Sequence, residues 1–268
     1  MSQSILAGKV AIVTGSSMGI GKAVAAALAQ KQVKVVLNGR NLEKLTRTTK
    51  ELQALGLEVF PIQGDVGIYE DCERLVAQTV AKYGALDILV NNAGLAMTGS
   101  IADAPADAFQ QVFHTNILGV LYPTKAAIPH LKATKGSVVF SGSIAGFMGI
   151  PNYSAYSASK MSLTALVQSL KIELAGTGVH VGINYIGFAE NDPKKTYLNE
   201  QGEVVAMPVR DQFKKMPVED VAQYFVTGIE KRKYKQTLSL LGKLTGIMPR
   251  FFPRIFEWAM IRTHLREG

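Results

Sequence analysis

The chain has 268 residues, 47% of them hydrophobic and 19% charged, which is ordinary for a soluble globular protein and enough for one α/β domain with a sizeable core. Its single cysteine, Cys72, excludes an internal disulfide and suits a reducing cytoplasm. The net charge is +8, but the sequence contains no nucleic-acid-binding motif, so we expect no nucleic-acid partner. It also contains no secretory signal and no run of about 18 apolar residues, so we expect neither a leader nor a membrane-spanning helix.

A glycine-rich turn follows the first predicted strand. Residues 9–13 read K-V-A-I-V, which is typical of a buried parallel strand, and residues 14–21 read T-G-S-S-M-G-I-G before a helical pattern. We expect Gly15 to form the tight turn, Gly19 to let a pyrophosphate approach the helix N-terminus, and Gly21 to permit close helix–strand packing. The spacing is G-x-x-x-G-x-G rather than G-x-G-x-x-G, and the alternative is an ordinary turn between a strand and a helix.

The end of the second predicted strand indicates which nicotinamide cofactor the chain prefers. This strand, over 33–38, ends in Asn38 and is followed by Gly39 and Arg40. Enzymes that use NAD often carry a carboxylate here for the ribose 2′-hydroxyl, and a carboxylate would repel a 2′-phosphate. A guanidinium binds that phosphate and stacks on adenine, so Arg40 predicts NADP(H) in preference to NAD(H).

The rest of the chain alternates apolar runs with helical patterns. This alternation predicts one Rossmann-like α/β domain, with a doubly wound parallel sheet of about seven strands, helices on both faces and a ligand crevice at the carboxyl ends of the strands. The predicted segments are strands over 57–62, 86–90, 136–141, 179–185 and 236–240, and helices over 42–55, 69–83, 107–132, 152–174 and 217–231.

Further polar and small residues follow the later strands. Asp65 and Val66 come after the third strand, and Asp65 would accept a hydrogen bond from the adenine amino group or cap the next helix. Residues 91–94 read N-N-A-G and would let a ribose or adenine lie against the backbone, with ordinary turn chemistry as the alternative. Asn116 is unfavourable inside the predicted helix over 107–132, so it either packs against a neighbour or has a task.

A tyrosine and a lysine one helical turn apart form the candidate reactive pair. Tyr156 and Lys160 are spaced i,i+4 and share a helix face, where an ammonium would lower the pKa of a phenol. Such a pair can transfer a proton to or from a carbonyl or hydroxyl substrate. Ser143 follows the fifth strand and would face the same helix, whereas Tyr153 has no lysine four residues later. On its own, the pair is also typical of a packed ring beside a solvated lysine.

Together these motifs resemble those of the short-chain dehydrogenase/reductase family over roughly residues 7–243. The matching motifs are the glycine-rich turn, Asp65, residues 91–94, Asn116, Ser143 and the run Y-S-A-S-K that ends at Lys160. Ser143 precedes Tyr156 by 13 positions, the usual separation in that family. The occurrence of several motifs in the right order is far more specific than any one of them.

The resemblance implies hydride transfer between a nicotinamide and a carbonyl carbon. Tyr156 would be the general acid in reduction and the base in oxidation, Lys160 would lower its pKa and hold the nicotinamide ribose, and Ser143 would orient the substrate oxygen. Asn116 would hold a water that links Lys160 to solvent, and no metal is implied. The implied cofactor contacts are Gly15, Ser17, Met18, Gly19, Ile20, Asn38, Arg40, Asp65, Val66, Asn92, Ala93, Gly94, Tyr156, Lys160 and Gly187.

One stretch departs from the family pattern. After the sixth strand the family usually has Pro-Gly and then a threonine, in a loop that meets the nicotinamide carboxamide. Here Ile186 replaces the proline and Asn191 stands near the position of the threonine. Gly187 is kept, so a backbone contact to the cofactor is still expected.

Residues 188–216 have no clear period and are interpreted as a long functional loop, a lid over the substrate. Aromatic and methionine side chains favour an apolar substrate, while the basic side chains would meet a phosphate or carboxylate, unless they are simply solvated. These residues are Phe188, Tyr197, Met207, Phe213, Lys194, Lys195, Arg210, Lys214 and Lys215.

The C-terminal tail, residues 244–268, lies beyond the expected catalytic domain over 1–243. Residues 231–268 hold nine Lys/Arg and two Glu, a net charge of +7, which leaves the preceding part of the chain close to neutral. Phe251, Ile255, Trp258 and Leu265 fall near one helical face. We weigh three interpretations of this basic, aromatic segment: a membrane-surface anchor, a subunit contact and a flap over the substrate pocket.

We therefore expect an NADPH-dependent carbonyl reductase or alcohol dehydrogenase for a lipid-like or steroid-like substrate. A 3-oxoacyl reductase acting on a carrier or CoA thioester is the enzymatic alternative, and an NADP(H)-binding scaffold or sensor is the non-enzymatic one. The family resemblance implies a homodimer or homotetramer that pairs through the helices over 107–132 and 152–174. We expect a cytoplasmic location, and the alternative is a cytoplasmic protein that contacts a membrane through its tail.

Overall fold

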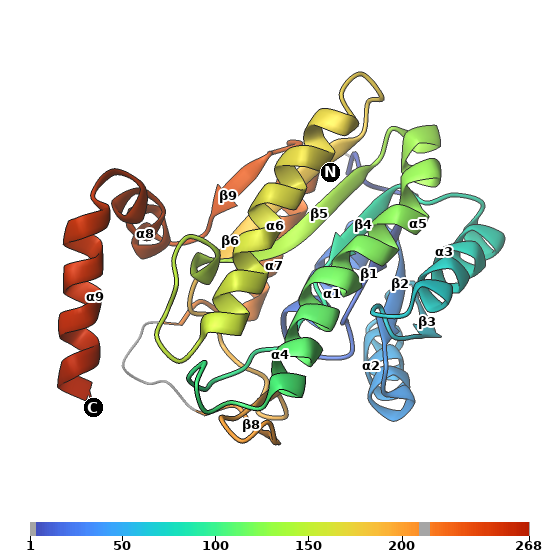
Figure 1. Cartoon of the computed structure of the whole chain (residues 1–268). Helices are drawn as coiled ribbons and strands as arrows, with labels where there is room; N and C mark the ends of the chain where they lie inside the picture. Colours follow the sequence, from blue (N-terminus) through green and yellow to red (C-terminus); the bar gives the residue numbers. More distant parts are fainter. Residues whose placement is uncertain (1–3, 209–214, 268) are drawn as a thin grey trace.

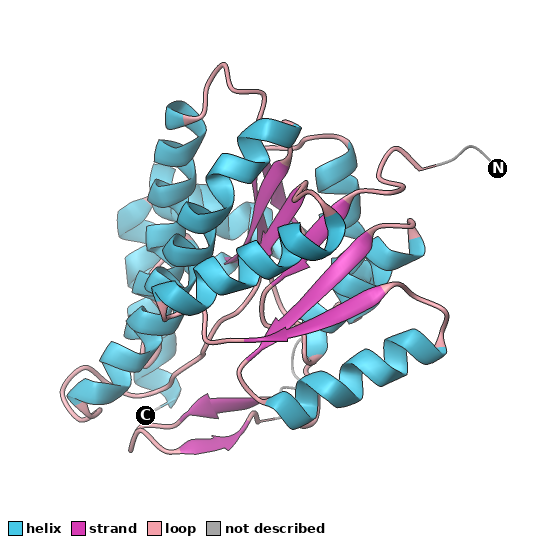
Figure 2. Ribbon diagram, turned by 90° about the vertical axis from the view of Figure 1, so that its right-hand side faces the viewer, coloured by secondary structure: helices cyan, strands magenta, loops and turns pink. Residues whose placement is uncertain are grey.

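The computed structural model describes residues 4–208 and 215–267, and within them a parallel seven-stranded sheet is covered by helices on both faces (Figures 1 and 2). The predicted α/β fold with about seven parallel strands is therefore confirmed. The strands are β1 (Val10–Val13), β2 (Lys34–Gly39), β3 (Val59–Gln63), β4 (Ile88–Asn91), β5 (Ser137–Ser143), β6 (His180–Ile186) and β9 (Lys235–Thr237).

The strand order is β3-β2-β1-β4-β5-β6-β9, and every pair is parallel. The chain runs outward from β1 to β3, returns to the centre at β4 and then runs outward in the other direction. The connections therefore diverge between β1 and β4. In a sheet of this kind, that divergence leaves a crevice beyond the carboxyl ends of the strands.

Two hydrophobic cores lie on opposite faces of the sheet because successive side chains of a strand point in opposite directions. Ala11 and Val13 of β1 join one core, and Ile12 between them joins the other. All three are fully buried, as expected for a sheet covered on both sides. The first core packs against α1 (Gly19–Gln30), α2 (Leu42–Ala54) and α7 (Val218–Glu230), and the second against α3 (Tyr69–Tyr83), α5 (Gly119–Thr134) and α6 (Ser154–Glu173).

The single helix predicted over 107–132 is wrong in one respect. The segment consists of α4 (Ala106–Phe113), a π-helical turn η1 (His114–Leu118) and α5. Tight packing accompanies this turn: a Cβ on Gly119 would lie 2.8 Å from the side chain of Val66. An apolar period cannot reveal a single π turn, because the turn inserts one extra residue over a stretch too short to establish a period.

The predicted lid contains regular structure that was not expected. β7 (Thr196–Leu198) and β8 (Val204–Ala206) form an antiparallel hairpin outside the main sheet, visible below the sheet in Figure 2. The backbone N–H of Met216 donates to the Phe188 carbonyl at 2.9 Å, which brings the two ends of the segment together. Strands of three residues are too short to give a readable alternation. Among the side chains assigned to the lid, Arg210, Phe213 and Lys214 lie outside the described residues.

The tail forms two helices, α8 (Leu240–Phe251) and α9 (Pro253–Glu267), beyond the edge strand β9 (Figure 1). The domain boundary expected at 243/244 falls inside α8. Pro249 is tolerated in the last turn of α8, whereas Pro253 begins α9, the position where the missing N–H costs least. Phe251 therefore belongs to a different helix from Ile255, Trp258 and Leu265. No described helix is long and apolar enough to cross a membrane.

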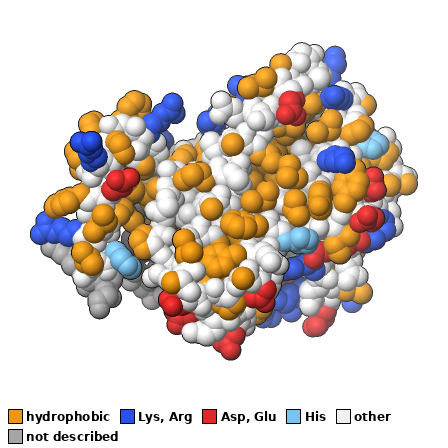
Figure 3. Space-filling view, viewed as in Figure 1, with side chains coloured by type: hydrophobic (Ala, Val, Ile, Leu, Met, Phe, Trp, Pro, Cys, Tyr) orange, Lys and Arg blue, Asp and Glu red, His pale blue; other side chains and the backbone are white. Residues whose placement is uncertain are grey.

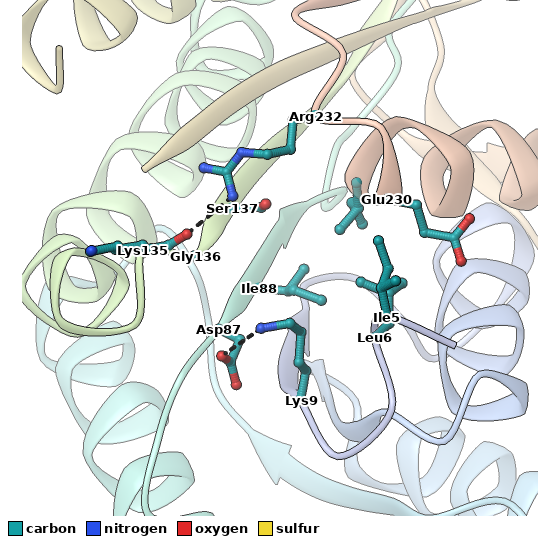
Figure 4. A pocket seen from close by; sticks show the side chains of 11 residues that line it. Ile5, Leu6, Lys9, Asp87, Ile88, Lys135, Gly136, Ser137, Glu230 and Arg232 are labelled. Atoms are coloured by element: carbon teal, nitrogen blue, oxygen red, sulfur yellow. Dashed lines mark hydrogen bonds and ion pairs between the residues drawn. The ribbon is translucent and has the colours of Figure 1, made fainter. Parts of the chain in front are cut away.

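The amino ends of the strands, opposite the crevice, enclose only a small cavity, and an arginine joins the turns beside it. A small cavity of about 110 Å³ lies there, beside the paired Lys9 and Asp87 (Figure 4). The guanidinium of Arg232 donates to the carbonyl of Lys135 at 3.2 Å and to the carbonyl of Gly178. It thereby joins the turn after α7 to the turns that precede β5 and β6.

Replacing Arg232 with methionine should lower the free energy of unfolding by about 1–2 kcal/mol, because two charge-assisted hydrogen bonds between separate turns are lost. Arg47→Met is the matched control, since Arg47 makes only a surface ion pair with Glu51 at 3.9 Å and should change stability by less than about 0.5 kcal/mol. Urea unfolding of the three proteins measures both values. Equal effects at the two positions would mean that the Arg232 contacts do not hold the turns.

Candidate active site

A cavity of about 830 Å³ opens at the carboxyl ends of the strands, across the divergence between β1 and β4. It brings together nearly every residue that the sequence singled out, although these residues come from distant parts of the chain. The expected site residues that line it are Gly15, Ser17, Met18, Gly19, Ile20, Asn38, Arg40, Asp65, Val66, Asn92, Ala93, Gly94, Ser143, Tyr156, Lys160 and Gly187.

The glycine-rich turn at one end of the cavity has the shape of an anion cradle. Gly15 has a φ of +62°, and a Cβ there would lie 2.8 Å from the Cα of Ala93. Gly19 has a φ of +54° and open space where a side chain would be. The first turn of α1 has neither a side-chain cap nor an acidic residue, so its N–H groups and dipole are available to a phosphate. These features fit the pyrophosphate of a dinucleotide.

Hydrogen bonds between neighbouring strand ends hold this turn in place. The Thr14 hydroxyl accepts from the backbone N–H groups of Asn92 at 3.0 Å and Ala93 at 3.1 Å. In return the Asn92 side-chain amide donates to the carbonyls of Thr14 at 3.0 Å and Gly15 at 3.2 Å. The Asn92 amide is thus used within the protein, and the surface it leaves for a ligand is mainly backbone.

Arg40 lies at the end of β2 beside the cavity, with its side chain 63% exposed. Its guanidinium is 3.7 Å from the Asp65 carboxylate, which also accepts from the Gly67 N–H at 2.9 Å in the turn before α3. A Cβ on Gly39 would lie 2.2 Å from the Ser17 hydroxyl. Position 39 therefore has little room for a carboxylate unless Ser17 moves, while Arg40 remains free to reorient toward a ligand.

Asn38, the residue before Gly39 in β2, stabilises the backbone at this end of the cavity. Its buried side-chain amide donates to the carbonyls of Ile62 at 3.2 Å and Gly64 at 3.3 Å. These bonds join the end of β2 to the end of β3. They also direct the chain after β3 toward the cavity, where Asp65 and Val66 follow.

The reactive pair lies at the other end of the cavity. Tyr156 is in the first turn of α6, and the Lys160 ammonium lies 5.9 Å from the centroid of its ring. Lys160 is only 6% exposed and donates to the Ser141 carbonyl at 3.0 Å. Burial, together with a smaller contribution from Lys195, lowers the pKa of Lys160 to about 8. The amine is still mostly protonated at neutral pH, so it places a cation beside the phenol.

Ser143 ends β5 and faces the same space. Its hydroxyl accepts from the Ala145 N–H at 3.2 Å and caps the short 3-10 helix η2 (Ile144–Gly146). A Cβ on Gly146 would lie 2.7 Å from the Lys160 carbonyl, so η2 is packed tightly against α6. This contact sets the position of Ser143 relative to the helix that carries Tyr156 and Lys160.

Asn116 lies behind the cavity and is not among the described residues that line it. It is fully buried in η1, where its carbonyl oxygen accepts from the Leu95 N–H at 2.8 Å. Its amide nitrogen donates to the Leu95 carbonyl and to the Ser159 hydroxyl, both at 2.9 Å. The side chain braces the strand-end segment against α6, so a water at this residue would have to use its backbone carbonyl.

Sequence reasoning missed several residues around the cavity. Lys44 lies near Arg40, and its position one turn into α2 was a readable signal. The Ser141 carbonyl carries no such signal, because every residue has one. Met260, Thr263 and His264 of α9 also line the cavity, so the tail reaches the site. A flap over the pocket is one of the three interpretations of the tail, but the sequence does not indicate which of its residues make the contact.

The residues that depart from the family pattern lie at the end of β6. Ile186 is the last residue of the strand and packs in the first hydrophobic core. Gly187 and Asn191 both line the cavity, and a Cβ on Gly187 would lie 3.1 Å from the Ser239 hydroxyl. The backbone at Gly187 therefore reaches the site even though isoleucine precedes it.

Comparison with known proteins agrees with this geometry. The family model described as short chain dehydrogenase matches residues 9–201. An 11-beta-hydroxysteroid dehydrogenase of Pinus massoniana is 30% identical over 94% of this chain and 72% of its own length. The 11-beta-hydroxysteroid dehydrogenase 1A of Arabidopsis thaliana is 32% identical over 94% of this chain and 74% of its own length. The 11-beta-hydroxysteroid dehydrogenase-like 4A of the same plant is 39% identical, and the chain spans 62% of its length.

Two solved structures share the architecture. A short chain dehydrogenase/reductase from Burkholderia phymatum in complex with NAD has a TM-score of 0.79 at 24% identity, over 92% of this chain and 93% of its own. An alcohol dehydrogenase from Thermococcus sibiricus complexed with 5-hydroxy-NADP has a TM-score of 0.74 at 26% identity, over 85% of this chain and 94% of its own. The first of these likenesses bears on the fold alone.

Proposed function

The chain belongs to the short-chain dehydrogenase family, and on that premise we propose that it is an NADPH-dependent oxidoreductase that interconverts a carbonyl and a secondary alcohol on an apolar substrate. One observation carries the proposal. A single cavity joins the glycine-rich cradle and Arg40 at one end to Ser143, Tyr156 and Lys160 at the other. A dinucleotide lying across it would be held by its phosphates beside the residues that handle the substrate oxygen.

Three side chains of this site have separate roles in the proposed proton transfer. In reduction, Tyr156 donates its phenolic proton to the carbonyl oxygen, and in oxidation it takes the proton back from the alcohol. Ser143 donates a hydrogen bond that orients the same oxygen, while the Lys160 ammonium favours the phenolate that remains. When bound, the nicotinamide supplies or accepts the hydride at the carbon atom.

The preference for NADP(H) rests on the corner formed by Gly39, Arg40 and Lys44. Two basic side chains, Arg40 after β2 and Lys44 in the first turn of α2, line the cavity, and no carboxylate stands at position 39. The Arg40–Asp65 contact at 3.7 Å is long and largely exposed, so it competes weakly with a phosphate.

Replacing Arg40 with alanine should raise the Kd for NADPH by about 10–100-fold and change the Kd for NADH by less than about threefold, because only the former carries a 2′-phosphate. Fluorescence titration of both cofactors measures the two constants. Arg47→Ala removes an exposed arginine on α2 away from the cavity and should leave both unchanged. Equal losses for NADPH and NADH in the Arg40 variant would refute the assignment.

Apolar side chains contribute to the wall of the cavity. Ile150, Phe188, Met207 and Met260 line it, which suits a lipid-like or steroid-like ketone. The names of the relatives, as 11-beta-hydroxysteroid dehydrogenases, support the steroid-like alternative. We retain residues 188–216 as a lid over the cavity and residues 1–243 as the catalytic domain, with α9 contributing to the wall.

A second substrate class has an observation of its own. Lys195 and Lys215 also line the cavity, as expected if a 3-oxoacyl thioester enters with its phosphorylated carrier. Turnover of a panel of steroid ketones, long-chain ketones and 3-oxoacyl thioesters with NADPH and NADH distinguishes the two classes. Failure of every substrate with both cofactors, despite tight NADPH binding, would favour a cofactor-binding scaffold or sensor.

We further propose a cytoplasmic homodimer or homotetramer. The faces of α5 and α6 expose Leu121 and Met161, apolar side chains that pairing with a second copy would cover. This pairing would leave the cavity open at the strand ends. Sedimentation velocity of the intact chain tests the expected assembly.

A further inference from the structure

The two tail helices each have one side turned to the protein and one apolar side turned to water. On α8 the inner side is made of glycines: a Cβ on Gly242 would lie 2.9 Å from the Ile144 side chain, and one on Gly246 would lie 3.3 Å from the Phe147 ring. The opposite side carries Leu244, Ile247 and Phe251, which are 50–67% exposed. The helix therefore packs through its smallest residues and leaves its largest ones uncovered.

The pattern repeats on α9. Met260 and His264 line the cavity, whereas Ile255, Trp258 and Leu265, spaced i, i+3 and i+10, lie on the other side of the helix and are 58–75% exposed. A surface helix of a soluble protein normally turns its polar side to water. Here the cavity takes one side, and the side facing solvent is apolar.

Basic side chains accompany both exposed stripes. The four described Lys and Arg residues of these helices are exposed, and the Arg262 guanidinium lies 5.2 Å from the centroid of the Trp258 ring. Figure 3 shows hydrophobic and basic side chains interspersed over this part of the molecule. Glu257 is the only acidic side chain that the structure describes on α8 or α9. The basic residues are Lys243, Arg250, Arg254 and Arg262.

The basic side chains of α8 and α9 favour one of the two partners that could cover the exposed apolar side chains, a second copy of the chain or a lipid surface. A second copy docked through the same surface would bring Arg254 and Arg262 against their own counterparts, since a two-fold contact pairs each patch with itself. An anionic lipid surface instead offers opposite charge to the arginines and an apolar layer to the tryptophan and aliphatic side chains. Aromatic rings beside arginines suit the boundary between headgroups and acyl chains.

We propose that α8 and α9 form a docking surface for an anionic lipid bilayer, defined by Leu244, Ile247, Phe251, Ile255, Trp258, Ile261 and Leu265 with their four basic neighbours. The helices lie at the interface and do not span it. Because the other side of α9 lines the cavity, docking places the cavity next to the lipid. The inference does not depend on the reaction that the site performs.

Flotation of the full chain with vesicles tests the proposal. Vesicles of phosphatidylcholine with about one third phosphatidylglycerol should carry the protein at low salt, and vesicles of phosphatidylcholine alone should carry at least about tenfold less. Ile255→Ser combined with Trp258→Ser should reduce anionic-vesicle binding by about tenfold or more, and Arg254→Gln combined with Arg262→Gln should reduce it and weaken its salt dependence. Leu55→Ser combined with Ile101→Ser removes two equally exposed apolar side chains elsewhere and should bind as the wild type does.

Three outcomes would overturn the proposal. They are absence of binding to anionic vesicles at low salt, equal binding to both kinds of vesicle, and binding that survives the Ile255 and Trp258 substitutions. Sedimentation velocity without vesicles tests whether a second copy of the chain covers this surface instead. If the Ile255 and Trp258 substitutions lower the mass of the assembly, a second copy covers it. Unchanged thermal unfolding of each variant shows that the comparison is made on folded protein.

Discussion

Replacing Tyr156 with phenylalanine should lower kcat by about 10²–10⁴-fold, because the change removes the hydroxyl that transfers the proton and little else. The ring stays in place in the first turn of α6, so packing around the Lys160 ammonium should be preserved. NADPH binding should remain within about threefold of wild type, since the glycine-rich cradle and Arg40 are untouched. Steady-state kinetics with an accepted ketone and a fluorescence titration of NADPH measure the two quantities.

Tyr153 is the matched control for this experiment. It lies three residues earlier, lines the same cavity and is also a tyrosine, but no lysine follows it by one turn. Tyr153→Phe should keep kcat within about tenfold of wild type, because no ammonium one turn along the helix supports proton transfer by the Tyr153 hydroxyl. If Tyr156→Phe turned over as fast as Tyr153→Phe, the proton would come from another group and the proposed mechanism would fail.

The site could be predicted from the sequence to the extent that parallel strands gather their carboxyl ends at one edge. The glycine-rich turn, Arg40, Asp65 and Ser143 stand at or within two residues of the carboxyl ends of β1, β2, β3 and β5, shortly after an apolar run. Once the runs are read as strands of one sheet, these residues must lie around a common crevice. The i,i+4 spacing of Tyr156 and Lys160 likewise predicts, from neighbouring residues alone, that both side chains lie on one face of a helix.

The parts that could not be predicted depend on contacts between distant segments. The Ser141 carbonyl that binds Lys160 and the close approach of Gly146 to α6 exist only once β5 and α6 are packed. The π turn around Asn116 and the three-residue strands of the lid are too short to leave a period in the sequence. The approach of α9 to the cavity is only one of three interpretations of the tail, because it depends on the direction that the chain takes after Phe252.

Burial of Lys160 should give the protein a measurable dependence of stability on pH. The buried ammonium has a pKa of about 8, whereas an unfolded lysine keeps its proton up to a pKa of about 10.5. Below about pH 7 both states are protonated and this residue contributes no pH dependence. Above about pH 8 the unfolded state binds more protons than the folded state, so stability attributable to Lys160 rises with pH until about 10.5.

Lys160→Met removes this titration, and the pH profile should change accordingly. The free energy of unfolding of the wild type minus that of the variant should rise by about 2 kcal/mol between about pH 7 and about pH 9.5, the amount expected for a pKa lowered to about 8. Both proteins should carry Tyr156→Phe as well, because the phenol of Tyr156 is coupled to the lysine; the difference then isolates Lys160. Chemical denaturation at several pH values measures it. The variant should also lose most of its turnover, because no cation remains beside Tyr156.

The matched control is Lys171→Met on the same helix. Lys171 is exposed, and its ammonium lies 3.9 Å from the centroid of the Tyr234 ring rather than in the site. Turnover of this variant should stay near that of the wild type, because the substitution removes an exposed lysine of α6 that does not line the cavity. A flat pH profile for Lys160→Met would show that water reaches the Lys160 amine. In that case solvent would screen the charge of Lys160, and its effect on the pKa of the Tyr156 phenol would be smaller than the proposed mechanism requires.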